Sequence, residues 1–548
     1  MASQDYFFIT DPGSGGVVTK NDPREIKENE SPYILNMDIK NKGRVISRTG
    51  YELWGTIVGA TGGFRGLLPY YRTYGADSGE YLLSFHSNGN AYYNTNAGGA
   101  PTSISTYGTD SGSVRGTVFN NLAIFGNGLT ANTIKKWAGT GNCASVGGTP
   151  PDTKIFGQVM NSVLGVDTAT PTTVKWCDID DPEDWTGGAS GNTTVGLGDG
   201  QDITWIGTVG DQPIIFKERS KWPFEIHNDA TTDYFVRFYL KEKKDLSGGC
   251  IATGSVIPMV NGQGEVLYYL SENGFQSYGA IENFSASRNP AELSFKIKPT
   301  VKRINFQYSD KINVEEWNDT VRWLVPYEHS QTNDTAFVFS TEFGAWTLYN
   351  GMNFADIKKF HDSNGRDMLI GASANEGKLF KFNNSFSDNG FGYERVYQSK
   401  TFTFGRRTQW KWIDIIGSKT IGGESSPFDG RGAIFVEVDV DGRKETYKIT
   451  DENLTRGTEG GYIGDNWMGD SYMGNGFAGD ATPMYDFRAR IQLKNIQFGH
   501  EMKFKIYNNG DGEGWSLRQY GYKIAPLNDE ISTTSNASGI AYAKPYNE

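Results

Sequence analysis

The sequence is poor in the residues that build disulfide, metal and nucleophilic sites. It has 3 cysteines, Cys143, Cys177 and Cys250, which are too few and too scattered for a disulfide framework or a zinc site. Its 5 histidines are far apart, and no HExxH or GxSxG motif accompanies them. We therefore predict buried free thiols, no metal, no cofactor, no catalytic residue and no enzymatic activity.

An excess of basic residues and long apolar runs are also missing. The formal net charge is −12, which argues against a protein that holds nucleic acid through clustered Lys and Arg. A surface past which DNA slides without sticking is compatible with that charge. No run of about 18 apolar residues occurs, and the first residues lack the regions of a signal peptide. We expect a protein that is made and kept in the cytoplasm, or that is delivered by assembly or lysis.

Helical periodicity is nearly absent, and pairs of short aromatic-rich strands joined by Gly/Asx turns take its place. The clearest pairs lie in 81–94, 266–279 and 367–383. Asn and Gly tolerate the positive φ of tight hairpin turns, and the 69 glycines suit many such turns. Strands at this spacing predict an all-β fold, a β-propeller of about six to eight blades.

The spacing of these patterns changes after a Gly/Asn/Ser stretch near residue 390. Segments 399–418, 432–449 and 487–510 alternate apolar and polar residues with period two, and Asp441-Gly442 marks a hairpin turn. This predicts an additional C-terminal antiparallel β domain with one buried face. We expect an N-terminal arm (1–30), a propeller (31–390), a C-terminal β domain (391–527) with an extended Gly/aromatic loop at 456–482, and a polar tail (528–548).

Four tandem pentads, YIGDN WMGDS YMGNG FAGDA, fill 462–481. They are too rich in Gly for ordinary strands. A structural surface loop, a projecting loop that contacts a partner or gates a channel, and a calcium loop all remain open, although the spacing of Asp465, Asp470 and Asp480 does not match an EF-hand. The candidate gate or contact residues are Tyr462, Trp467, Met468, Tyr472, Met473 and Phe477.

Two segments combine basic and aromatic residues, FGRRTQWKW (404–412) and KERSKW (217–222). Such clusters could stack on bases and bind phosphate. In an acidic chain, a cation–π or ion-pair patch between subunits is favoured. The candidate patch residues are Arg406, Arg407, Trp410, Lys411, Trp412, Lys217, Arg219 and Lys221.

An ordered set of short motifs runs from Glu30 to Phe382. The set comprises Ser31-Pro32, Leu35-Asn36, Gly43-Arg44, Arg48-Thr49-Gly50-Tyr51, Lys175-Trp176-Cys177-Asp178, Asp181-Pro182-Glu183-Asp184-Trp185, Asp199-Gly200, Ile215-Phe216-Lys217-Glu218-Arg219-Ser220, Gly344-Ala345-Trp346 and the turn from Gly371 to Lys378. In this order the motifs resemble the β-propeller tail nozzle or tail-hub proteins of short-tailed bacteriophages. The last third of the chain has no such match.

The resemblance implies a structural virion protein. It implies a ring, a homohexamer, that closes the distal end of the phage tail tube and allows genome ejection. The implied partners are further copies of the chain, a portal-proximal adaptor protein, tail fibres or spikes, and genomic DNA in transit, with contact to the host envelope as an alternative. No catalytic residues are carried over.

A propeller on the virion that binds or cleaves host glycans is the alternative function. The segment 339–349 is similar to the Asp-box turn of sialidase propellers, with Ser340, Gly344 and Trp346 present and Glu342 in place of Asp. Cleavage needs two carboxylates placed across a sugar, or a Tyr nucleophile with arginines. A monomeric interaction scaffold is a further alternative.

Overall fold

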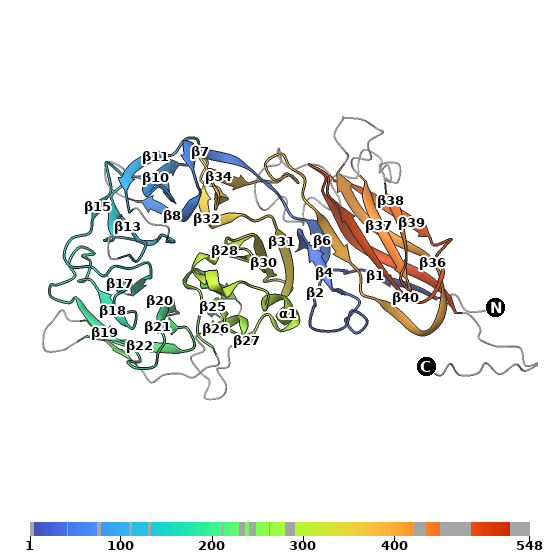
Figure 1. Cartoon of the computed structure of the whole chain (residues 1–548), viewed down its shortest axis with the longest axis horizontal. Helices are drawn as coiled ribbons and strands as arrows, with labels where there is room; N and C mark the ends of the chain where they lie inside the picture. The colour runs from blue at the N-terminus through green and yellow to red at the C-terminus, as the bar shows by residue number, and fades with distance from the viewer. Residues whose placement is uncertain are drawn as a thin grey trace, which may run out of the picture.

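The chain folds into two β-rich parts that lie at opposite ends of an elongated molecule (Figure 1). The computed structural model describes residues 5–40, 42–73, 78–108, 112–129, 133–159, 161–210, 212–228, 236–240, 248–261, 264–279, 291–420, 433–449 and 484–526. In these residues helical structure is limited to η1 (Thr253–Ser255), η2 (Phe295–Ile297), α1 (Lys298–Val301) and η3 (Phe306–Lys311). None of these helices is long and apolar enough to cross a membrane.

In the described residues, the first part forms a β-propeller of seven four-stranded antiparallel blades. Blades 1 to 3 are β8 (Phe64–Arg72), β9 (Gly79–His86), β10 (Asn90–Thr95) and β11 (Thr102–Thr106); β12 (Arg115–Phe119), β13 (Leu122–Gly126), β14 (Lys135–Trp137) and β15 (Ala144–Ser145); and β16 (Phe156–Val159), β17 (Ser162–Val166), β18 (Thr173–Trp176) and β19 (Gly191–Thr194). Blades 4 to 6 are β20 (Ile203–Val209), β21 (Gln212–Lys217), β22 (Lys221–Asn228) and β23 (Val236–Leu240); β24 (Ile257–Asn261), β25 (Gly264–Ser271), β26 (Gly274–Gly279) and β27 (Ala291–Glu292); and β28 (Asn313–Trp317), β29 (Thr320–Val325), β30 (Thr335–Ser340) and β31 (Ala345–Asn350). The propeller prediction is confirmed, and the three hairpins expected from sequence are β9–β10, β25–β26 and β33–β34.

An N-terminal strand closes the ring of blades. Blade 7 takes β32 (Phe354–His361), β33 (Asp367–Ser373) and β34 (Glu376–Phe382) from the end of the propeller segment, and β7 (Tyr51–Thr61) from its beginning. β7 pairs antiparallel with β34. Side chains of blades 1 and 7, including Leu67 and Phe360, share one buried cluster. The two ends of the propeller segment are therefore held together without a covalent link.

The centre of the propeller is bridged by Arg115 of blade 2. Its guanidinium donates to Asn313 Oδ1 at 2.9 Å and to the carbonyls of Asp310 and Ile312 at 3.2 Å each. Asn313 begins blade 6, which is not a neighbour of blade 2 in the ring. This contact therefore crosses the middle of the propeller and ties opposite blades to each other.

The second part is a C-terminal sheet folded on itself around one core. It contains β35 (Arg395–Gln398), β36 (Phe402–Thr420), β37 (Ile434–Val440), β38 (Arg443–Ile449), β39 (Met484–Gln492), β40 (Phe498–Asn508) and β41 (Trp515–Pro526). The strand β36 pairs with β40 on both sides of a register shift between Thr403 and Thr408, with β41 from Thr408 onward and with β39 from Trp412 onward. One long strand thus belongs to both halves of the fold. The predicted C-terminal β domain and its Asp441-Gly442 hairpin are confirmed.

The N-terminal segment differs from the arm and propeller boundary that we expected. β1 (Asp5–Ile9) pairs with β41, β4 (Tyr33–Leu35) pairs with β35, and β6 (Arg44–Ser47) pairs with β41 and with β5 (Met37–Lys40). The short strands β2 (Gly16–Val17) and β3 (Glu30–Ser31) pair with each other. The strands β1, β4, β5 and β6 therefore belong to the C-terminal sheet. Alternation in sequence predicts strands, but partners distant in the chain decide which sheet they join.

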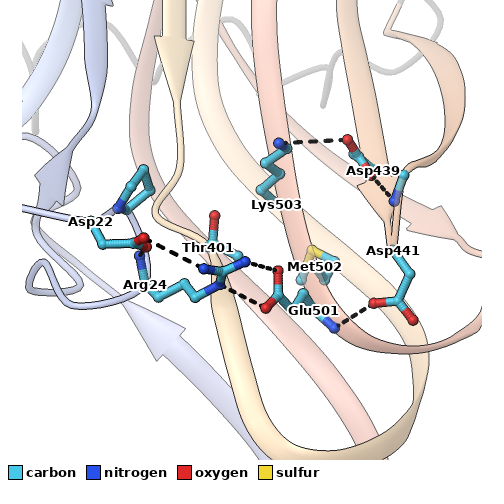
Figure 2. A pocket seen from close by; sticks show the side chains of 10 residues that line it. Asp22, Arg24, Thr401, Asp439, Asp441, Glu501, Met502 and Lys503 are labelled. Atoms are coloured by element: carbon cyan, nitrogen blue, oxygen red, sulfur yellow. Dashed lines mark hydrogen bonds and ion pairs between the residues drawn. The ribbon is translucent and has the colours of Figure 1, made fainter. Parts of the chain in front are cut away.

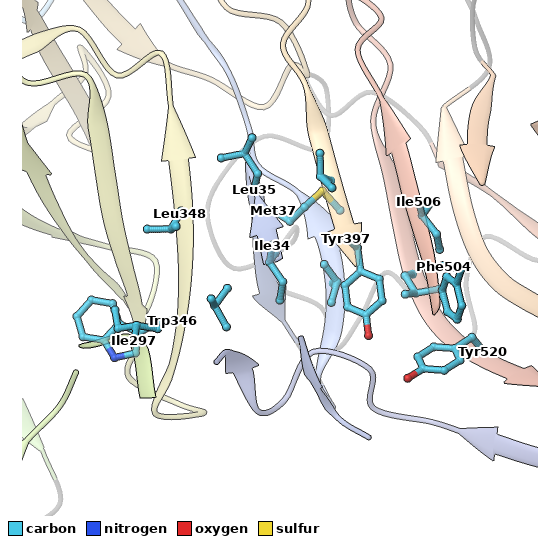
Figure 3. Close-up of a cluster of buried hydrophobic side chains, with 14 of the residues drawn as sticks. Ile34, Leu35, Met37, Ile297, Trp346, Leu348, Tyr397, Phe504, Ile506 and Tyr520 are labelled. Carbon is cyan, nitrogen blue, oxygen red and sulfur yellow. The ribbon is translucent and has the colours of Figure 1, made fainter. Parts of the chain in front are cut away.

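The two parts share a hydrophobic core, shown in Figure 3. Trp346 and Leu348 of β31 lie beside Ile34 of β4, and Tyr397 and Phe504 continue the same cluster into the C-terminal sheet. Leu348 is also the partner of Leu35 in a parallel pairing of β31 with β4. Blade 6 and the C-terminal sheet are therefore one continuous sheet and core.

A buried arginine network forms the junction where the chain leaves and re-enters the C-terminal sheet. The Arg48 guanidinium binds both Asp388 oxygens, at 2.8 and 2.6 Å, and its Nε donates to Asn36 Oδ1 at 3.0 Å. Arg48 and Arg395 lie 3.8 and 3.9 Å from the ring of Tyr393. Burial alone would lower the pKa of Arg48, but the hydrogen bond and charge of Asp388 together with the nearby Tyr393 and Tyr349 outweigh burial and raise the pKa overall. This pairing compensates a cation that is only 1% exposed.

Candidate functional site

The outer face of the C-terminal sheet carries basic and aromatic side chains on four adjacent strands. Along β36, β39 and β41, residues such as Ile413, Phe487 and Tyr522 point into the core, and their neighbours point outward. We call the outward set the basic-aromatic face. It consists of Tyr6 and Phe8 of β1, Trp412 and Asp414 of β36, Arg488 and Arg490 of β39, and Lys523 of β41.

Asp414 is the centre of this face. Its side chain is fully buried beneath its neighbours. Arg490 binds it through Nε at 2.7 Å and Nη2 at 2.8 Å, the Tyr6 hydroxyl donates at 2.9 Å, and Arg488 lies at 3.7 Å. Burial alone would raise the pKa of Asp414, but the hydrogen bonds from Arg490 and Tyr6 hold it below its usual range. The carboxylate therefore fixes an arginine and a tyrosine in place.

Trp412 lies between two cations. The Arg490 guanidinium is 4.9 Å from the Trp412 ring and the Lys523 ammonium is 4.4 Å from it. Cation–π contacts of this kind stabilise by about 0.5–1 kcal/mol at exposed sites. The ring orders both cations and is itself half-buried by them.

Gly521 makes room for the two aromatic residues of β1. A Cβ at this position would lie 2.8 Å from Phe8 Cδ2, 2.9 Å from the Tyr6 hydroxyl and 2.7 Å from the Phe7 carbonyl. Because Gly521 pairs with Asp414 in the sheet, Tyr6 reaches across β41 to the carboxylate. A larger residue here would separate Tyr6 from Asp414.

The face remains accessible despite these contacts. Tyr6 and Phe8 are 45% and 40% exposed, and the side chains of Arg488 and Arg490 are 57% and 49% exposed. Guanidinium groups and aromatic rings can bind carboxylates, phosphates or apolar groups. The arrangement offers donors and flat surfaces, which is the chemistry of a binding surface.

The predicted patch on β36 is divided between the face and the core. Trp412 lies on the face, whereas Trp410 is 1% exposed, belongs to the core and donates to the Gly499 carbonyl at 3.3 Å. The register shift between Trp410 and Trp412 explains this, since one extra residue, Lys411, reverses the side to which the strand points its side chains. Arg406 and Arg407 are exposed in the earlier irregular stretch of β36, with Arg407 5.9 Å from the Phe498 ring.

The second predicted cluster lies in the propeller and does not join the first. Lys217 is fully buried and binds Asp199 at 2.6 Å and the Val195 carbonyl at 2.9 Å. Lys221 is also buried, donates to the Gly248 carbonyl at 2.6 Å, and burial lowers its pKa to about 8.

Only one cation of that second cluster is on the surface. Arg219 is 69% exposed and pairs with Glu272 at 3.2 Å. The two lysines therefore have structural roles inside blade 4, and the cluster is not a patch.

The remaining predictions concern the candidate gate loop, the C-terminal tail, the thiols and the Asp-box-like segment. The candidate gate residues Tyr462, Trp467, Met468, Tyr472, Met473 and Phe477, like the loop at 456–482 and the tail at 528–548, lie outside the described residues. The three thiols are unpaired, with Cys177 and Cys250 buried and Cys143 half-buried. In the segment similar to an Asp-box, Trp346 is buried and donates to the Leu293 carbonyl at 2.9 Å, so its Trp is a core residue, whereas Thr341, Glu342 and Gly344 of the turn are exposed.

Sequence reasoning missed six of the seven residues of the face: Tyr6, Phe8, Asp414, Arg488, Arg490 and Lys523. The period-two alternation of 487–492 was visible, and it places both arginines on one side of a strand. The position of β1 was not, because its pairing joins the two ends of the chain. The missed residues therefore depended on long-range strand order.

A surface cavity of about 280 Å³ lies where the N-terminal segment meets β40 (Figure 2). Arg24 binds Glu501 through Nε at 2.7 Å and Nη2 at 3.2 Å, and Lys503 lies 3.6 Å from Asp439. The Arg24–Glu501 pair fastens residues 22–24 to the sheet. Among the described residues, no group of three or more His, Cys, Asp or Glu side chains could hold a metal ion.

Neither a family model nor a curated protein sequence matches the chain. Among solved structures, the chain is similar to the β-propeller domain of Cps50 (Swd1) from Myceliophteria thermophila, with 11% identity, a TM-score of 0.38, and coverage of 61% of this chain and 99% of that one. It is similar to YCF48 from Cyanidioschyzon merolae, with 9% identity, a TM-score of 0.38, and coverage of 61% and 98%. It is also similar to an exo-beta-1,3-galactanase from Phanerochaete chrysosporium, with 9% identity, a TM-score of 0.25, and coverage of 70% and 97%. At these TM-scores the likeness carries no argument about function, and the propeller assignment rests on the strand order of the chain itself.

Proposed function

We propose that this chain is a non-catalytic structural protein of a bacteriophage virion that assembles into the nozzle or hub ring of the tail. In this role it closes the tail channel and lets the genome out. The proposal rests on two things: the resemblance of the ordered motifs between Glu30 and Phe382, and the architecture of the molecule.

The observation that carries the proposal is the position of two early motifs, Leu35-Asn36 and Arg48-Thr49-Gly50-Tyr51, at the junction of the two domains. Asn36 and Arg48 belong to the buried network around Asp388. Gly50 lies so close to the chain at Ser387 that a Cβ would approach the Ser387 carbonyl oxygen to 1.8 Å. The motif Arg48-Thr49-Gly50-Tyr51 therefore builds the contact that fixes the propeller against the C-terminal sheet.

A wall element of a tail needs such a connection. Three features hold the two domains as one body: their shared core, the pairing of β31 with β4, and the junction, through which the chain passes once out of the C-terminal sheet and once back into it. In a ring under internal pressure, rigid subunits keep the interface geometry constant while smaller segments move. This supports a mechanical role better than a catalytic one.

Other features of the described residues fit the same role. At the cavity of Figure 2, Asp22 and Glu501 pair with Arg24, Asp439 pairs with Lys503, and Asp441 accepts hydrogen bonds from the His500 and Glu501 amides. A glycosidase instead places two carboxylates across an open sugar site. The Asp-box-like turn contributes Trp346 to the core.

The test is electron microscopy and mass photometry of the purified full chain, with a search for the chain in purified phage particles. We expect closed rings of several copies and a fixed copy number per virion. A strictly monomeric protein that is absent from virions would refute the proposal. Turnover of a host polysaccharide by the purified chain would favour the glycan alternative.

A further inference from the structure

We propose that the basic-aromatic face binds an acidic surface of a second copy of this chain. The contact would be one of the interfaces of the ring, so this inference rests on the proposed function. It assigns a partner to the outer face of the C-terminal sheet, whose inner face already packs into the core of the subunit.

The composition of the face is that of an interface core. Tyr, Trp, Phe and Arg are enriched at protein interfaces and dominate their binding energy, whereas Lys, Glu and Asp are depleted. Tyr6, Phe8, Trp412, Arg488 and Arg490 lie together here, with Tyr6 and Phe8 unusually exposed for aromatic residues. An exposed aromatic and guanidinium cluster on a flat sheet is a surface that a protein partner would cover.

The face is also ordered before a partner arrives. Asp414 holds Arg490 with two hydrogen bonds and Tyr6 with a third, and Trp412 contacts both Arg490 and Lys523. Binding therefore costs little additional side-chain entropy at these positions. Arg488, whose nearest acidic oxygen is 3.7 Å away on Asp414, retains donors for an incoming carboxylate.

Charge favours a second copy, and it selects the kind of contact. The face presents Arg488, Arg490 and Lys523, while the whole chain carries −12, so the remaining surface of a copy is acidic. Two basic faces repel each other, which disfavours a twofold contact of the face with itself. A contact between the face and a different, acidic surface is heterologous, and heterologous contacts are those that close into rings.

The geometry favours a protein partner over nucleic acid. Single-stranded nucleic acid is held by open aromatic rings on which bases stack. Here the Trp412 ring is already in contact with Arg490 and Lys523, and the Tyr6 hydroxyl is bound to Asp414. Three cations also release few counterions, so a duplex would bind only weakly at physiological salt.

The experiment compares three full-length proteins by sedimentation velocity and mass photometry over a range of concentrations. The face variant Phe8→Ser/Arg488→Glu leaves the Asp414–Arg490 pair intact. The control variant Arg219→Glu/Val260→Ser makes the same changes of charge and polarity on the propeller, where Arg219 is 69% and Val260 78% exposed. Circular dichroism and thermal unfolding establish that each variant is folded.

We expect the face variant to raise the dissociation constant of assembly at least tenfold, and the control to change it less than twofold. Added salt should weaken the wild-type assembly, because the contact is partly ionic. If the face variant forms rings as readily as the wild type does, this inference is overturned and the proposed function stands. A wild-type chain that is monomeric throughout would overturn both.

A duplex DNA of about two helical turns serves as the competing ligand in the same assay. Binding of this duplex by the wild type but not by the face variant, with assembly unchanged, would identify the face as a nucleic-acid surface and overturn the inference. Equal, weak binding by all three proteins is the expected result.

Discussion

Removal of the Asp388 carboxylate is expected to loosen the junction between the two domains. In the wild type, Asp388 is the charged partner of Arg48, at 2.8 and 2.6 Å, and the Arg48 side chain is 1% exposed. Asp388→Ala leaves a buried cation with only neutral acceptors. Breaking a buried ion pair in this way costs about 3 to 5 kcal/mol.

Hydrogen exchange of the amides at the junction measures this cost locally. The amides of Gly50, Tyr51 and Asn389 donate across the junction, to Ser385, Ser387 and Tyr51 respectively, at 2.7, 3.1 and 2.6 Å. They exchange only when the junction opens. A loss of 3 to 5 kcal/mol corresponds to exchange that is faster by roughly two to three and a half powers of ten.

A matched control separates this effect from the loss of any ion pair. Glu376 and Lys378 form a surface pair at 2.5 Å in which both side chains are well exposed, and such pairs contribute about 0 to 1 kcal/mol. Glu376→Gln should therefore leave the junction amides unchanged. Junction exchange in Asp388→Ala that stays within a factor of three of the control would refute the reasoning that Arg48 depends on Asp388.

Three further predictions concern the propeller and the face. Burial lowers the pKa of Lys221 to about 8, below about 10.4 for an unfolded chain. The charged Lys221 therefore destabilises the fold fully below pH 8, and this effect disappears as the pH rises past about 10.4. Lys221→Met should gain up to about 3 kcal/mol in unfolding free energy at pH 7 and nothing near pH 10.5, and equal gains at both would contradict this. Gly521→Val should displace β1, because there is no room for a Cβ at this position. We expect a loss of about 1 to 3 kcal/mol in unfolding free energy and faster hydrogen exchange of the Phe7 amide. Unchanged hydrogen exchange would show that β1 adapts. Arg115→Met should remove the bridge to Asn313 and lower the thermal unfolding midpoint, measured by scanning calorimetry, whereas an unchanged midpoint would show that the bridge adds no stability.

The sequence predicted the fold class and part of the site for identifiable reasons. Turn chemistry and alternation depend on residues within about ten positions of each other, so the hairpins β9–β10, β25–β26 and β37–β38 could be located in advance. The closure of blade 7 by β7 pairs Tyr51 with Phe382. No local pattern contains that information.

The basic-aromatic face shows the same limit at the level of single residues. Trp410 and Trp412 are two positions apart, and alternation alone places them on one side of the strand. The irregularity at Lys411 sends Trp410 into the core and Trp412 to the surface. Basic and aromatic letters in one segment, as in 217–222, likewise did not reveal that Lys217 and Lys221 are buried.

The sequence by itself determined that this chain is built of many short strands with tight turns, because strand and turn preferences act locally. It also determined the acidic charge of the chain and the order of the short motifs between Glu30 and Phe382. Only the tertiary structure decided that β1, β4, β5 and β6 join the C-terminal sheet, and that Tyr6 meets Asp414 across 408 positions of sequence. Such contacts are selected by packing and strand register over the whole fold, which no segment of the chain encodes alone.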